Sequence, residues 1–111
     1  MVIGSGVTEI MRYAFYKCNL ASLNIPNNVK IIGEESFSEN PLNTIILGKG
    51  LTSIGSGLRS KEVYSFIEKP FKTNAFYNVN NSTLYVPKGT IELYKNTTSW
   101  NHFGFIYEME K

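Results

Sequence analysis

Cysteine and histidine are almost absent from this chain of 111 residues, which contains one of each. A single thiol, Cys18, excludes an internal disulfide framework and any zinc site built from several cysteines. The sequence groups no acidic or thiol partners near His102, so it gives no support for a metal site or a histidine-based catalytic triad. We therefore expect His102 to be a surface residue, and we predict no catalytic residue, no metal and no cofactor.

Charged residues and long apolar runs are also scarce. Charged residues make up 18% of the chain, whereas roughly 25% is usual in soluble domains, and 11 basic against 9 acidic residues leave a net charge of +2. Lysine and arginine do not cluster as they would along a phosphate backbone, which argues against a nucleic-acid partner. No run approaches the roughly 18 apolar residues of a membrane span, and residues 1–6 lack the features of a signal peptide.

What the chain does contain is apolar residues and asparagine. Hydrophobic residues make up 42% of the sequence, and the length predicts a single domain around one core. Asparagine occupies 12 of the 111 positions, which predicts many turns.

Apolar motifs repeat at a constant step along the chain. The segments 7–10, 29–32 and 51–54 are alike, and they begin at equal intervals. Further positions keep the same step: Phe15 and Phe37, Cys18 and Asn40, Leu20 and Leu42, Leu23 and Ile45, and Ile25 and Leu47. Such a period is typical of a solenoid built from stacked coils.

The period divides the chain into units within a single repeat domain, residues 1–111. We expect a partial coil at 1–6, repeats at 7–28, 29–50 and 51–69, and an irregular last coil with a cap at 70–111. The third unit is expected to be one residue shorter, because Ile54 to Leu58 spans four residues where Ile10 to Phe15 spans five. Residues 1–6 resemble 45–50, so the chain is expected to begin at the last strand of a coil. An uncovered edge there would allow self-association.

Each unit predicts one half-buried strand and one turn. In residues 20–25, Leu23 and Ile25 alternate with Ser22 and Asn24, which is the two-residue period of a strand. We expect successive coils to pair these strands in parallel. The inward side chains of the turns are expected to stack in one column: Phe15, Phe37, Leu58 and Phe76.

The C-terminal end predicts a cap. Gly89-Thr90 is a helix start signal, and Ile91 and Tyr94 lie three residues apart on one face, so residues 88–94 predict a short helix. The side chains expected to close the last layer of the core are Trp100, Phe103, Phe105, Ile106 and Tyr107.

The units resemble the BspA-like leucine-rich repeats of bacterial surface proteins. The similarity includes residues 25–29 and 32–37, and residues 83–90 followed by Tyr94 and Trp100 are similar to the segment that often ends such arrays. The resemblance implies a right-handed solenoid with short parallel strands, little helix and an irregular capped C-terminus. It also implies a secreted or surface-held bacterial protein that acts in adhesion, with no catalytic residues.

Two other features have both a functional and a structural interpretation. Cys18 could be a reactive thiol, but it shares a column with Asn40, so we expect a buried structural thiol. Glu34 and Glu35 could form an acid and base pair, but they occupy variable positions of the repeat, and we expect a solvated corner.

The outward side of the long strands is the surface most suited to recognition. The candidate binding residues are Ser22, Asn24, Thr44, Ile46, Tyr64, Ser65 and Ile67. The apolar members would form a strip that a monomer need not expose. Alternatively, the loop 70–83 covers Tyr64 and Ile67.

Two hypotheses for function follow from these features. In the first, the chain is a non-enzymatic protein-binding and adhesion module of a bacterial cell-surface or secreted protein, and its partner is a host matrix or cell-surface protein. In the second, the chain is a structural C-terminal spacer and cap of a longer array, and the ligand binds elsewhere.

Overall fold

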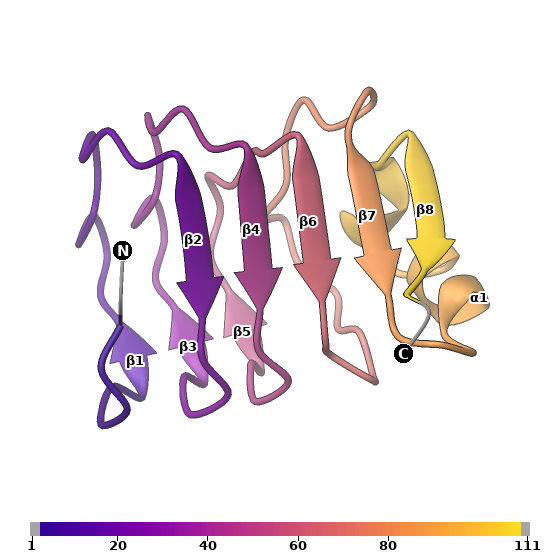
Figure 1. Cartoon of the computed structure of the whole chain (residues 1–111), viewed down its shortest axis with the longest axis horizontal. Coiled ribbons are helices and arrows are strands. Elements are labelled where there is room, and N and C mark those ends of the chain that lie inside the picture. Colours follow the sequence, from indigo (N-terminus) through magenta and orange to yellow (C-terminus); the bar gives the residue numbers. More distant parts are fainter. Residues whose placement is uncertain (1–2, 110–111) are drawn as a thin grey trace.

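The computed structural model describes residues 3–109, which wind into a solenoid (Figure 1). Within the described residues, one wall of the solenoid consists of four-residue strands: β2 (Ser22–Ile25), β4 (Thr44–Leu47), β6 (Glu62–Ser65), β7 (Thr83–Val86) and β8 (Phe105–Glu108). A second wall consists of two-residue strands: β1 (Glu9–Ile10), β3 (Ile31–Ile32) and β5 (Ser53–Ile54). Helix α1 (Ile91–Lys95) and the 3-10 turn η1 (Trp100–His102) lie at the C-terminal end.

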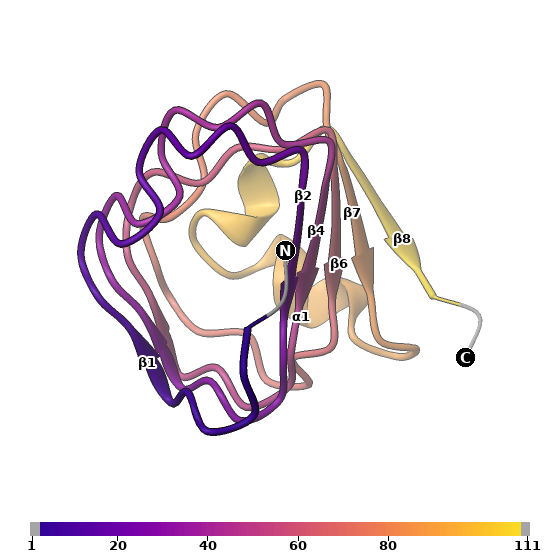
Figure 2. The ribbon, with the colours of Figure 1, turned by 60° about the vertical axis from the view of Figure 1, so that its left-hand side comes forward.

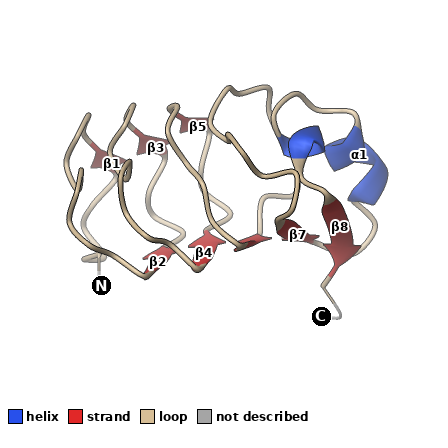
Figure 3. Ribbon diagram, turned by 90° about the horizontal axis from the view of Figure 1, so that it is seen from above, coloured by secondary structure: helices blue, strands red, loops and turns tan. Residues whose placement is uncertain are grey.

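Neighbouring strands in both walls are parallel, in the orders β1-β3-β5 and β2-β4-β6-β7-β8. Ile10 pairs with Ile32, and Ile32 with Ile54, so the period of the sequence is the step between stacked short strands. The long strands run downward in Figure 1 as the chain advances from β2 to β8 and returns behind them, which is a right-handed winding (Figures 1 and 3). In Figure 2 the coils nearly superimpose, and the helical segment lies at their far end. The predicted leucine-rich-repeat type of solenoid is therefore confirmed.

The core is filled by the inward residues of each long strand. In β2, Leu23 and Ile25 are buried and Ser22 and Asn24 are exposed, so the predicted alternation is confirmed. Strand pairing extends this alternation across the coils into one continuous buried column: Leu23, Ile45, Val63 and Leu84. Each fully buried aliphatic side chain of this kind stabilises the fold by roughly 1.5–3 kcal/mol.

The predicted stack of turn side chains is also present. The rings of Phe15 and Phe37 lie 5.3 Å apart between centroids, with their planes within 6° of parallel. Leu58 forms an isolated parallel bridge with Phe76, which continues the column into the last coil. Phe76 then packs against Trp100, with ring centroids 4.9 Å apart.

The third coil is shorter than the sequence analysis predicts. Thr44 follows Ile32 by twelve residues, whereas Glu62 follows Ile54 by only eight, and these residues occupy the same strand positions. The expected difference of one residue is therefore wrong, because the third coil also lacks the part of the turn that contains Asn40 in the second coil. Leu58 is followed almost directly by the next strand.

Asn40 connects the second coil to the first. Its side-chain oxygen accepts a hydrogen bond of 2.9 Å from the backbone N–H of Leu20, and its amide group donates bonds of 2.9 Å to the carbonyl oxygens of Phe15 and Phe37. The bonds to Leu20 and Phe15 reach the preceding coil, and the bond to Phe37 lies within the second coil. Cys18 occupies the same column in the first coil, and no coil precedes it among the described residues. The expected burial of Cys18 is therefore wrong, and its thiol is exposed.

The C-terminal cap is built around Trp100. Its indole is fully buried and donates a hydrogen bond of 2.8 Å to the carbonyl oxygen of Phe71. The Tyr94 ring of α1 lies 5.1 Å from the Trp100 ring at an interplanar angle of 88°. Ser99 accepts a hydrogen bond of 3.0 Å from the backbone N–H of Phe76. The helix expected within residues 88–94 is confirmed as α1.

Only part of the predicted closing layer lies inside. Trp100 and Phe103 are buried as expected, but Phe105 is 49% exposed and Tyr107 is 53% exposed. These two residues occupy outward positions of β8, because the segment continues the long-strand wall instead of folding over the core. Ile106, between them, packs against the core cluster.

The strand expected at the very start of the chain falls mainly outside the described residues, which begin at Ile3. Ile3 is partly buried and packs against the core. Self-association through this end stays a prediction.

Replacing Phe37 by alanine should lower the free energy of unfolding by about 3–5 kcal/mol, because the ring has packed coils on both sides. Urea denaturation would measure the change. The matched control is Phe66→Ala, since Phe66 is 44% exposed and its loss should cost less than about 1 kcal/mol. Equal midpoints for the two variants would show that the Phe37 column is not core.

Asn40→Ala should destabilise the fold by about 1–3 kcal/mol, because it leaves backbone groups of two coils without partners. The control is Cys18→Ala in the same column, which should change stability by no more than about 0.5 kcal/mol. Chemical denaturation distinguishes the two. A neutral Asn40→Ala variant would contradict the inter-coil role of this amide.

Tyr94→Phe should lower stability at neutral pH and also flatten its alkaline dependence. The phenol hydroxyl of Tyr94 donates to the carbonyl oxygen of Ile67 and contacts Ser65 Oγ at 2.7 Å. Burial raises the pKa of Tyr94 from 10.0 to about 12. Its stabilising contribution is therefore complete below pH 10 and is lost as the pH rises toward 12.

The difference in stability between wild type and Tyr94→Phe should shrink over that pH range, as measured by denaturation at several pH values. Tyr107→Phe, at an exposed site, is the control. A constant difference between wild type and Tyr94→Phe would contradict the link to ionisation.

Candidate binding face

The outward side of the long-strand wall presents two columns of side chains, which together we call the outward face. The first column crosses the wall at the second residue from the end of each strand: Asn24, Ile46, Tyr64, Tyr85 and Tyr107. The second column crosses it at the first residue of each strand: Ser22, Thr44, Glu62, Thr83 and Phe105. Polar residues predominate toward β2, and aromatic residues predominate toward β8.

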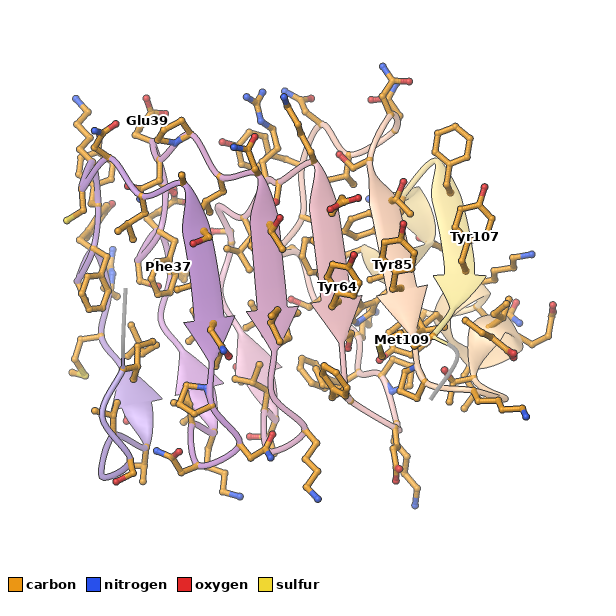
Figure 4. The ribbon with its side chains drawn as sticks, in the orientation of Figure 1. Phe37, Glu39, Tyr64, Tyr85, Tyr107 and Met109 are labelled. Carbon is orange, nitrogen blue, oxygen red and sulfur yellow. The ribbon has the colours of Figure 1, made fainter. Side chains whose placement is uncertain are left out.

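Three tyrosines form a ladder on this face (Figure 4). The rings of Tyr64 and Tyr85 stack with centroids 4.5 Å apart and planes within 9° of parallel. The ring of Tyr107 lies 6.2 Å from that of Tyr85, at an angle of 39°. Each ring therefore packs against its neighbour along the face.

Tyr64 presents a neutral hydroxyl group at physiological pH. Burial of Tyr64 raises its pKa above the ordinary value of 10.0, and the nearby Glu62 and Tyr85 raise it further. A neutral phenol combines a hydrogen-bonding hydroxyl with an apolar ring, a combination that is common at protein interfaces.

A shallow hollow adjoins the ladder at the end of β4. Its walls include Pro26, Ile46, Gly48 and Phe66. A side chain at Gly48 would place its Cβ 2.6 Å from the carbonyl oxygen of Ile25, so the two coils can approach here only with glycine. Phe66 is 44% exposed beside this glycine.

The structure places five of the seven candidate residues on the outward face: Ser22, Asn24, Thr44, Ile46 and Tyr64. Ser65 and Ile67 are a correction, because both are buried. The expected shortening of the third unit by one residue places Ser65 in the column of Thr44, whereas the strand register pairs Glu62 with Thr44. The offset between Glu62 and Ser65 is an odd number of positions, so it exchanges the inward and outward sides of the strand.

Sequence reasoning missed the aromatic half of this face. Tyr85, Phe105 and Tyr107 were not among the candidates, although all three belong to the paired columns. The alternation of Thr83 to Val86 was a usable signal for Tyr85. The sequence signal for Phe105 and Tyr107 in β8 was weaker, because the chain reaches this strand only after the helical cap.

The remaining candidates do not assemble a reactive centre. Glu34 is exposed, and Glu35 accepts a hydrogen bond of 2.9 Å from Ser56 Oγ and another from Ser38 Oγ. These bonds lower the pKa of Glu35, so it is a carboxylate at neutral pH. His102 is exposed, as expected. Among residues 3–109, no group of three or more His, Cys, Asp or Glu side chains could hold a metal ion.

Stacked coils, parallel short strands and continuous apolar columns define a repeat protein of the solenoid class. A family model described as BspA type Leucine rich repeat region (6 copies) matches residues 1–101. The chain therefore belongs to the BspA-type leucine-rich repeat family, as its repeat predicted. Searches of curated proteins and of solved structures found no match.

Membership in this family supports a protein-interaction repeat module, and the family is associated with bacterial surface proteins. Within residues 3–109, no helix has the length and apolar character needed to cross a membrane.

Proposed function

We propose that the chain is a non-enzymatic module that binds a protein through the outward face. The tyrosine ladder is the observation that carries this proposal. Three phenol rings stand side by side on the outward side of the sheet, where Tyr64 and Tyr85 are half-buried and Tyr107 is 53% exposed. Tyrosine supplies contact area at a low entropic cost, because few torsions become fixed on binding.

The size of the face favours a modest affinity. Five strands at about 4.8 Å spacing and four residues of about 3.3 Å each give a surface of roughly 320 Å². A stable protein interface buries about 800 Å² on each partner. The hollow beside Phe66 adds area, and display of several copies would raise avidity without new contacts.

The proposed setting is adhesion by a bacterial cell-surface or secreted protein, with a host matrix or cell-surface protein as partner. Family membership supports this setting. The proposed partners include no nucleic acid, because the outward face has no lysine or arginine in its two columns.

A second candidate function is that of a structural spacer and C-terminal cap, with the ligand bound elsewhere. The observation that favours it is the closed C-terminal layer of the core, where Trp100 is fully buried under α1 and η1. This role requires no contact through the outward face.

Solid-phase binding to immobilised host matrix proteins separates the two candidates. The test variant is Tyr64→Thr with Tyr85→Thr, because threonine keeps the strand propensity and removes both rings. We expect this variant to bind at least about tenfold more weakly than wild type, a change that corresponds to about 1.4 kcal/mol. The control is Leu93→Ala on helix α1, where Leu93 is 52% exposed.

Undiminished binding of the double variant would exclude the outward face as the binding site. Binding by neither wild type nor variant would favour the spacer role. Circular dichroism of each variant confirms that the fold is retained.

A further inference from the structure

A second hollow lies on the wall of turns, away from the outward face. We call it the tyrosine-glutamate hollow. It is lined by Tyr13, Tyr16, Glu35, Ser38, Glu39, Ser56, Gly57, Asn74, Ala75 and Tyr77. Figure 4 labels Glu39, which lies among the turns above and to the left of β2, well apart from Tyr64, Tyr85 and Tyr107. Three successive turns of the solenoid and the loop before β7 contribute to it.

Aromatic rings form part of its wall. Tyr13 and Tyr16 stand nearly perpendicular, with centroids 5.6 Å apart and an interplanar angle of 87°. Tyr77 lines the other end of the hollow, on the last coil, where its backbone N–H donates to the carbonyl oxygen of Leu58. The three rings are between 40% and 51% exposed, so the core does not account for them.

Two carboxylates line the same hollow. The bonds from Ser38 and Ser56 hold the carboxylate of Glu35 in place from two adjacent coils, and they use only part of its accepting capacity. Gly57 keeps this group accessible, because a Cβ there would lie 2.3 Å from Ser38 Oγ and 2.7 Å from Glu35 Oε1. Glu39 lies four residues after Glu35 on the same turn, and its side chain is exposed.

Among the described residues, no lysine or arginine lines the hollow to neutralise these carboxylates. Two cations lie over its rings instead: Arg12, whose Cζ is 5.5 Å from the Tyr13 centroid, and Lys17, whose Nζ is 5.4 Å from the Tyr16 centroid. The lining itself combines aromatic rings with two negative charges.

We propose that the tyrosine-glutamate hollow binds an alkylammonium group. Aromatic rings attract a cation whose charge is spread over methyl or methylene groups, and carboxylates add a Coulombic attraction. Two carboxylates without a third ligand suit an organic cation better than a metal ion, and they repel phosphate. A lysine side chain of a bound protein and a free quaternary amine share this chemistry.

Titrations followed by two-dimensional NMR distinguish these sources. The probes are choline and N-acetyl-lysine methylamide. Their neutral counterparts are 3,3-dimethylbutanol and N-acetyl-norleucine methylamide. Because one small group supplies the contacts, we expect a Kd on the order of millimolar, with shifts at Tyr13, Tyr16 and Tyr77. Tighter binding of choline identifies a free quaternary amine as the source, and tighter binding of the lysine probe identifies a protein side chain.

Matched variants test the role of each part. Glu35→Gln should raise the Kd about tenfold, since it removes one charge and keeps the size of the side chain. Glu34→Gln is the control, because the neighbouring Glu34 is exposed and does not line the hollow. Tyr16→Leu should also weaken binding, and unchanged signals from the core residues verify folding in each case.

Equal binding of the neutral counterparts, or an unchanged Kd in both Glu35→Gln and Tyr16→Leu, would overturn the proposal. Absence of shifts with both ammonium probes would do the same. The Tyr64→Thr, Tyr85→Thr variant should keep ammonium binding, so failure of the outward face as a protein site leaves this test intact.

Discussion

The hydrogen bonds between neighbouring coils are the constraint on which the rest of this structure depends. Lys30 N–H donates to the carbonyl oxygen of Thr8 at 2.7 Å, and Thr52 N–H donates to that of Lys30 at 2.8 Å. Each coil thus fixes the height and register of the next. Because register also decides which side chains point inward, these bonds set both the core columns and the outward face.

A ladder of this kind does not close by itself, since every coil leaves an apolar layer for its successor. Here a change of structure covers the last layer. Trp100 is fully buried and packs against Phe76, and Tyr94 packs against Trp100. The hydroxyl of Ser99 accepts a hydrogen bond from the backbone N–H of Phe76, at the position that a further coil would occupy. The long-strand wall nevertheless continues through β8, so the aromatic columns extend beyond the point where the short-strand wall stops.

Most of the fold could be predicted from the sequence, because equally spaced motifs at 7–10, 29–32 and 51–54 imply stacked coils, and alternation within 20–25 implies the buried side of the strand. The errors have two causes, and the first is that a column position does not reveal what lies on either side of it. Cys18 matches Asn40 in sequence, but among the described residues only Asn40 has a preceding coil to bond with. Ser65 was misplaced because the third coil loses residues on both sides of its turn, and only the strand pairing shows how many.

The candidate site lies where the sequence repeat is least regular. From Ile46 to Tyr64, Tyr85 and Tyr107, the spacing along the chain differs at each step, yet each pair of neighbours is in register. Turns absorb the differences in length, while the strand pairing stays constant. The side chains at outward positions can therefore differ in chemistry from coil to coil, as long as each strand keeps its register with its neighbours. Stacked rings can form across coils of unequal length, and a recognition surface can form without disturbing the core columns behind it.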